Sequence, residues 1–140
     1  HWRAHVTHVL SIEFLQLVRR HLNPGGVLFF NTTNSAAIEL TGVTVFPYGI
    51  MVGNCLALSD APINPDVNRW KQVILEYRID DTPVLKTERV DDQRKLAQLI
   101  SSFSSLVETE QIRKRSAGSR IITDDNMASE WGSTRASASR

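Results

Sequence analysis

The stretch Val27-Leu28-Phe29-Phe30-Asn31-Thr32-Thr33 decides the fold class of this chain. Four consecutive apolar residues suit a strand that is covered on both faces, as in a parallel sheet flanked by helices. The chain is therefore predicted to form an α/β domain. In open sheets of this kind, ligands bind at the carboxyl ends of the strands, where this chain carries an amide and two hydroxyls. Asn31, Thr32 and Thr33 are therefore candidate site residues, and the alternative is that they only begin a turn.

The segments around this strand show helical and strand patterns in turn. Before the strand, a helix is expected from about Ser11 to Leu22, with Ser11 as its cap and a stop at Asn23-Pro24. After the strand, residues 34–40 favour a helix, although the β-branched residues of 41–45 are typical of a strand. Further on, we expect strands at 50–52, 55–58 and 121–123, and helices after Asn64-Pro65, from Asp91 and over 109–115. The apolar stripe of the helix from Asp91 is predicted to be core.

Composition excludes several classes of protein. The 140 residues include 16 Lys and Arg against 15 Asp and Glu, so the basic excess of a dedicated nucleic-acid binder is absent and nucleic acid is not expected as a partner. The single cysteine, Cys55, rules out a disulfide framework within the chain and favours a reducing compartment, the cytoplasm. No stretch approaches the roughly 18 apolar residues of a membrane span, so this chain itself is not expected to contact a membrane.

The two ends of the chain carry their own expectations. The sequence opens at His1 without an initiator methionine and reaches a helix within a few residues, so we expect a fragment of a longer protein. Residues 1–131 are expected to form one domain, and the small, polar residues 132–140 a disordered tail.

The first eight residues contain two possible sites. His1, His5 and His8 have spacings that would place two imidazoles on one side of a helix, but no neighbouring Cys or carboxylate completes a zinc site, and no metal is predicted. Trp2 and Arg3, together with His1, could form a recognition loop, because Arg supplies a fork for carboxylates and Trp a flat face for stacking. The alternative is a terminal strip that packs on the surface.

A second polar cluster follows the expected strand at 121–123. Asp124, Asp125 and Asn126 could bind a cationic amine, hold a divalent metal or cap a helix that begins at Met127. Capping would explain only one of the three residues, so they are candidate substrate-binding residues.

Other chemistry-bearing residues have simpler interpretations. Arg113-Lys114-Arg115 and Arg120 could meet phosphates, but cations also favour the negative end of a helix. Cys55 is expected to be a core thiol. No GxGxxG, P-loop, GxSxG or CxxC motif is present, so no catalytic residue can be named.

Several strings of the sequence resemble the second half of spermidine synthase-like proteins. The most discriminating are His1-Trp2-Arg3-Ala4-His5-Val6-Thr7 and Ile122-Thr123-Asp124-Asp125-Asn126-Met127, and Leu22-Asn23-Pro24-Gly25-Gly26-Val27 and Asn31-Thr32-Thr33 lie between them. Asn64-Pro65-Asp66-Val67-Asn68-Arg69-Trp70 and Glu130-Trp131 resemble a bacterial branch of the group, some of whose members carry a membrane-spanning N-terminal region. The helix, Pro-Gly-Gly and strand portion is shared with class I methyltransferase-like folds in general.

The resemblance implies a partial Rossmann-like domain, the second half of a sheet with its flanking helices, without the N-terminal cofactor-binding strands. It implies transfer of an aminopropyl group from decarboxylated S-adenosylmethionine to an amine such as putrescine. The residues that can be carried over are those of the loop 1–3 and of the strand end 31–33. The chain alone is expected to be inactive, because the nucleotide loop and the catalytic aspartate of the family would lie on earlier strands.

Two other functions stay open at this point. The protein could be a methyltransferase-like enzyme that uses S-adenosylmethionine itself, or a non-catalytic binding or assembly module. Half of a parallel sheet would leave an open edge, so a homo-oligomer is expected.

Overall fold

The computed structural model describes residues 10–103 and 105–126, and these form two compact units. The first unit contains the described residues up to Ile63 and those from Val107 onward. The second unit is Asn64–Leu106 and interrupts the first in the sequence.

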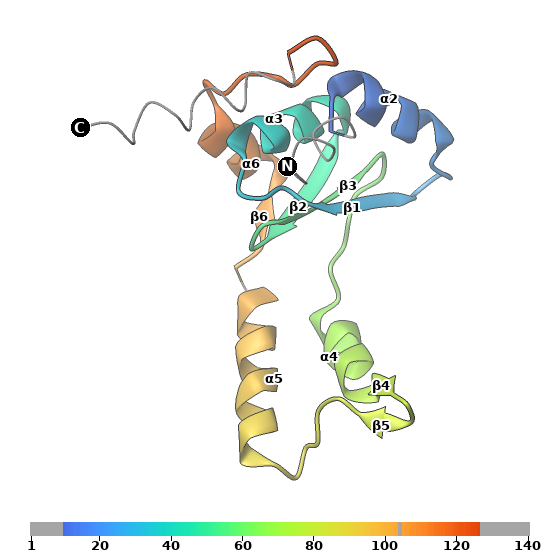
Figure 1. The fold of residues 1–140 in the computed structure, drawn as a ribbon, viewed down its shortest axis with the longest axis vertical. Helices are drawn as coiled ribbons and strands as arrows, with labels where there is room; N and C mark the ends of the chain where they lie inside the picture. Colours follow the sequence, from blue (N-terminus) through green and yellow to red (C-terminus); the bar gives the residue numbers. More distant parts are fainter. Residues whose placement is uncertain (1–9, 104, 127–140) are drawn as a thin grey trace, which may run out of the picture. The chain divides into compact units, whose positions relative to one another are not determined.

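The first unit is a four-stranded sheet with helices on one face (Figure 1). Its elements in chain order are α2 (Ile12–His21), β1 (Val27–Asn31), α3 (Ala36–Val45), β2 (Tyr48–Val52), β3 (Cys55–Ser59), β6 (Val107–Glu108) and α6 (Thr109–Ser116). The strand order is β1-β3-β2-β6, and every neighbouring pair is antiparallel. Because β1 and β2 both run antiparallel to β3, they point in the same direction.

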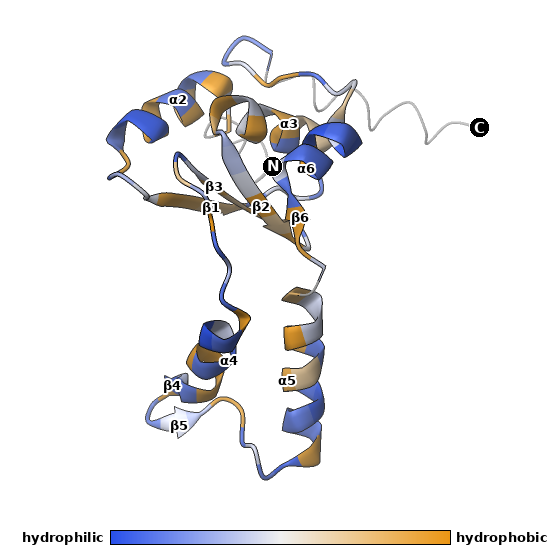
Figure 2. Ribbon diagram, turned by 180° about the vertical axis from the view of Figure 1, so that it is seen from behind, coloured by the Kyte–Doolittle hydropathy of each residue, from blue (hydrophilic) through white to orange (hydrophobic). Residues whose placement is uncertain are grey.

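The antiparallel sheet corrects the prediction of a purely parallel one. Strand β1 has its apolar run, but only Leu28 and Phe30 pack toward the helices, whereas Val27 is 49% exposed and Phe29 is 66% exposed. Figure 2 shows the apolar colouring of β1. An apolar run indicates that both faces of a strand can be buried, and it does not specify the direction of the neighbouring strands. The established architecture is thus a mixed α/β fold with an antiparallel sheet.

The core lies between the sheet and the helices α2, α3 and α6. Its fully or almost fully buried members come from all of these helices and from β2 and β3: Leu15, Val43, Val45, Phe46, Met51, Leu56, Leu58 and Ile112. Helix α3 approaches the sheet closely at Gly42, where an added Cβ would lie 2.9 Å from Cδ1 of Leu58. This close packing explains why residues 41–45 continue the helix rather than form a strand, since a helix places Gly42 against the sheet.

The second unit consists of two helices and a hairpin. Its elements are α4 (Val67–Glu76), β4 (Arg78–Ile79), β5 (Thr82–Pro83) and α5 (Val90–Phe103). The side chain of Asp66 caps α4, two residues after the expected start at Asn64-Pro65. The rings of Trp70 and Phe103 join the two helices, with centroids 4.4 Å apart. The apolar stripe of α5 is only partly buried, and the one fully buried residue of this helix is Asp92.

Candidate functional site

The carboxyl end of β1 carries three of the predicted site residues. Thr32 is fully buried, its N–H donates to the carbonyl of Asn54 at 2.7 Å, and its hydroxyl donates to the same oxygen at 3.1 Å. Asn31 and Thr33 are exposed, and the side-chain oxygen of Asn31 accepts the N–H of Thr33 at 2.7 Å. Thr32 therefore fixes the strand end to the β2–β3 turn, while Asn31 and Thr33 remain accessible to a ligand.

The backbone after this strand end adopts an unusual conformation. Thr33 and Asn34 have φ values of 53° and 60°, in the left-handed region that a β-branched residue such as threonine rarely enters. Ser35 then caps α3 by accepting the N–H of Ile38. Backbone conformations of this kind often occur at functional sites, where the surrounding structure holds them. The two interpretations of residues 31–33, as the beginning of a turn and as candidate site residues, are thus compatible. The residues make a tight turn that leaves the side chains of Asn31 and Thr33 exposed.

The segment 121–126 holds the second predicted cluster and has no regular strand, contrary to the strand expected at 121–123. Asn126 closes a local loop, because its Oδ1 accepts the N–H of Thr123 at 2.8 Å and its Nδ2 donates to the carbonyl of Ile121 at 2.9 Å. Asp124 and Asp125 are exposed. Asn126 therefore shapes the segment, and the two aspartates are the groups that it presents.

Glu13 belongs to the same acidic group as Asp124 and Asp125, although no local sequence pattern indicates this contact. The N–H of Asp124 donates to Oε2 of Glu13 at 3.0 Å, across 111 positions of the chain. In the sequence, Glu13 is explained by its place in the first turn of α2, where a carboxylate favours the helix dipole. The contact places the backbone of Asp124 beside Glu13 at the start of α2.

A small apolar cluster connects the acidic segment to the strand end. Ile122 is buried together with Leu10 and Ile38, and Phe30 and Ala37 pack against them. Phe30 directly precedes Asn31, and Ala37 lies in the first turn of α3. Two hydrogen bonds fix the segment further, from the N–H of Ile12 to the carbonyl of Ile122 and from the N–H of Ile122 to the hydroxyl of Thr41. The structure thus ties the segment 121–124 to α2 and α3 and, through the Ile122 cluster, to Phe30 of β1.

The predicted loop of His1, Trp2 and Arg3 lies outside the described residues, as do His5 and His8. The description begins at Leu10, which is a member of the same apolar cluster. Within residues 10–103 and 105–126, no group of three His, Cys, Asp or Glu side chains is arranged to hold a metal ion.

Two arginines of the basic run 113–115 make contacts within the fold. Arg113 donates to the carbonyl of Val43 at 3.0 Å, and Arg115 pairs with the buried Glu39 at 2.7 Å. These contacts favour the structural interpretation of the basic run over phosphate binding. A shallow open depression of about 370 Å³ lies at the other end of α2, lined by Gln16, Arg19, Arg20 and Asp60. Sequence reasoning did not foresee it, because Arg19 and Asp60 are 41 positions apart.

No protein-family model, curated protein or solved structure matches this chain. In the part of the chain that the structure describes, no helix has both the length and the apolar character needed to cross a membrane.

Proposed function

We propose that this chain is the C-terminal part of a spermidine synthase-like aminopropyltransferase domain with a Rossmann-like fold, acting in the cytoplasm. The fold supports this proposal through β1 and β2, which point in the same direction and are connected by helix α3. A helix that joins two strands of the same direction is the repeating unit of Rossmann-like sheets.

The observation that carries the proposed function is the acidic group of Glu13, Asp124 and Asp125 at the start of α2, where the N–H of Asp124 donates to the carboxylate of Glu13. Asp124 and Asp125 are exposed, and Asn31 and Thr33 at the end of β1 are further exposed polar residues. A diamine such as putrescine carries two ammonium groups at neutral pH, and exposed carboxylates are suitable partners for one of them. In this proposal, the acidic group holds the far ammonium while the near nitrogen is kept in line for reaction.

The cofactor of the reaction would be decarboxylated S-adenosylmethionine. The neutral amine nitrogen would attack the aminopropyl carbon bound to the sulfonium sulfur, the C–S bond would break, and the neutral thioether nucleoside would leave. The described residues suit the amine better than the nucleotide, because the glycine-rich loop that cradles a nucleotide is absent from the sequence. No residue here is placed as the base that removes the proton of the amine. We therefore propose that the chain by itself contributes amine binding and lacks turnover.

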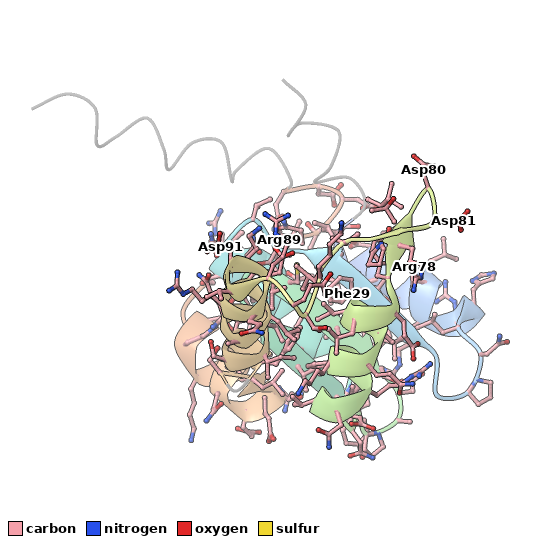
Figure 3. The ribbon with its side chains drawn as sticks, turned by 90° about the horizontal axis from the view of Figure 1, so that it is seen from below. Phe29, Arg78, Asp80, Asp81, Arg89 and Asp91 are labelled. Atoms are coloured by element: carbon pink, nitrogen blue, oxygen red, sulfur yellow. The ribbon has the colours of Figure 1, made fainter. Side chains whose placement is uncertain are left out.

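Amine binding can be tested by titrating putrescine into the 140-residue chain and following the amide resonances by NMR. The proposal expects shifts at 31–33 and 124–126, and loss of these shifts in the variant Asp124→Asn/Asp125→Asn. The matched control is Asp80→Asn/Asp81→Asn, which removes an exposed aspartate pair from the β4–β5 turn (Figure 3). Equal weakening in both variants would indicate unspecific charge attraction and would contradict an amine site at 124–125.

A second measurement addresses the reaction class. Calorimetric titration with decarboxylated S-adenosylmethionine should give no tight binding, and addition of putrescine should give no turnover. Tight binding with turnover would refute the claim that the chain is inactive. In a longer parent protein, greater thermal protection by S-adenosylmethionine than by its decarboxylated form would favour a methyltransferase instead.

A further inference from the structure

The outer edge of β1 is open, and its hydrogen-bonding groups can be identified from the ladder. The N–H of Thr32 donates to the carbonyl of Asn54, so this pair is of the hydrogen-bonded kind. Because such pairs alternate along an antiparallel ladder, residues 30 and 28 also bond to β3. Val27, Phe29 and Asn31 therefore direct their main-chain N–H and C=O groups away from β3. No further strand pairs with β1 within the described residues.

Strand β1 lacks the features that usually protect such an edge. Its five residues include no charge and no proline, and its register with β3 continues without a bulge from Val27 to Asn31. The opposite edge of the sheet is different, since β6 has only two residues and includes Glu108. The unprotected edge is thus specific to β1.

The side chains of β1 extend the apolar character of this edge. Phe29 is 66% exposed and Val27 is 49% exposed, and both lie on the face of the sheet opposite to α2, α3 and α6. Figure 3 labels Phe29 in the view from below. The partner that this surface fits is another uncharged, extended segment that offers matching N–H and C=O groups and an apolar side chain opposite Phe29.

We propose that this partner is β1 of a second copy of the chain, paired antiparallel about a two-fold axis at Phe29. In that register the two Phe29 side chains are direct cross-strand neighbours, and Val27 lies opposite Asn31 of the other copy. No like charges are opposed, and Leu28 and Phe30 keep their place on the helix side, so the two four-stranded sheets become one continuous sheet. This inference concerns the 140-residue chain, and it competes with the proposed Rossmann-like domain, whose missing strands would occupy the same edge of β1.

The size of the contact determines how strong the pairing is. A pair of five-residue strands buries less than the roughly 1,200 Å² of total surface that stable interfaces need, so the dimer is weak. Sedimentation of the 140-residue chain should therefore show reversible dimerisation that grows between about 10 μM and 1 mM. At the upper end, the amide protons of Val27 and Phe29 should exchange more slowly with solvent than at the lower end.

Two variants test the geometry. Phe29→Lys places a charge on the edge and should abolish dimerisation, and Val27→Pro should weaken it, because it removes an N–H that points outward and takes no part in the β1–β3 ladder. The control is Tyr77→Lys, which replaces another exposed aromatic residue and should leave dimerisation unchanged.

The proposal is overturned by a monomer over the whole concentration range, by a dimer that survives both β1 variants, or by an equal loss in Tyr77→Lys. Circular dichroism shows whether the variants fold. Should a β1 variant fail to fold, amide exchange of the unmodified chain decides: Val27 and Phe29 amides that stay unprotected at high concentration refute the pairing.

Discussion

The buried ion pair between α3 and α6 allows a sharp prediction for stability. Glu39 on α3 is 4% exposed, and its Oε2 accepts a hydrogen bond from Nε of Arg115 on α6 at 2.9 Å and forms an ion pair with Nη2 at 2.7 Å. Replacing Arg115 by methionine keeps the length and apolar stem of the side chain but removes the guanidinium. The carboxylate of Glu39 is then left buried without the partner that compensates its desolvation.

The expected loss can be estimated from the burial of the two groups. Removing one partner of a fully buried pair costs about 3–5 kcal/mol. The side chain of Arg115 is 38% exposed, so water can reach part of the vacated space, and we expect a loss of about 2–3 kcal/mol. In the double variant Glu39→Met/Arg115→Met no charge remains unpaired, and most of the lost stability should return.

Urea unfolding followed by far-ultraviolet circular dichroism measures these differences. Arg120→Met makes the same chemical change at an exposed residue and should alter the free energy of unfolding by less than about 0.5 kcal/mol. The reasoning fails if Arg115→Met is as mild as this control, or if the double variant is no more stable than Arg115→Met.

Three further substitutions have directions set by single contacts. Gly42→Ala should lower the free energy of unfolding by about 1 kcal/mol and with it the melting temperature, because crowding of Leu58 outweighs the gain in helix propensity. A higher melting temperature would show that the Leu58 side chain can move away without cost. The N–H of Lys86 donates to the carboxylate of Asp92 and lowers its pKa from the usual 3.8. The stabilisation of the folded second unit by this carboxylate is therefore complete above pH 3.8 and is lost as the pH falls through the lowered pKa. Asp92→Asn should make proteolysis of the second unit less sensitive to acid, and unchanged sensitivity would contradict this. Thr32→Val removes the buried hydroxyl that donates to the carbonyl of Asn54, so it should lower the free energy of unfolding by about 1 kcal/mol and shift the urea midpoint downward. An unchanged midpoint would show that this hydrogen bond does not contribute to stability.

Local signals in the sequence predicted several elements of the first unit, although the strand expected at 121–123 is absent and β6 was not predicted. The Ser11 cap and the Asn23-Pro24 stop agree with α2, and the strands expected at 50–52 and 55–58 agree with β2 and β3. Both rest on contacts between residues close in sequence, and such contacts follow from side-chain chemistry alone. The pairing of β1 with β3 joins residues more than 20 positions apart, and an apolar run carries no information about strand direction.

The candidate site shows the same division between local and distant contacts. The polar character of Asn31, Thr33, Asp124 and Asp125 is visible in the sequence, and all four residues are exposed in the structure. The participation of Glu13 depends on a hydrogen bond across 111 positions, for which no local pattern exists. A carboxylate in the first turn of a helix is already explained by the dipole, so its second contact could only be found in three dimensions.

Helices α4 and α5 show where hydrophobic periodicity stops being informative. Their apolar residues have helical spacing, as predicted, yet no apolar side chain of either helix is fully buried. Trp70 and Phe103 are in contact, while Val73 and Leu99 are 45% and 43% exposed. Hydrophobic periodicity indicates which face of a helix is apolar. Whether that face is buried depends on contacts with residues that are distant in the sequence. Since burial of that face supplies most of the stability of a helix, the sequence predicts these two helices without predicting how firmly they are held.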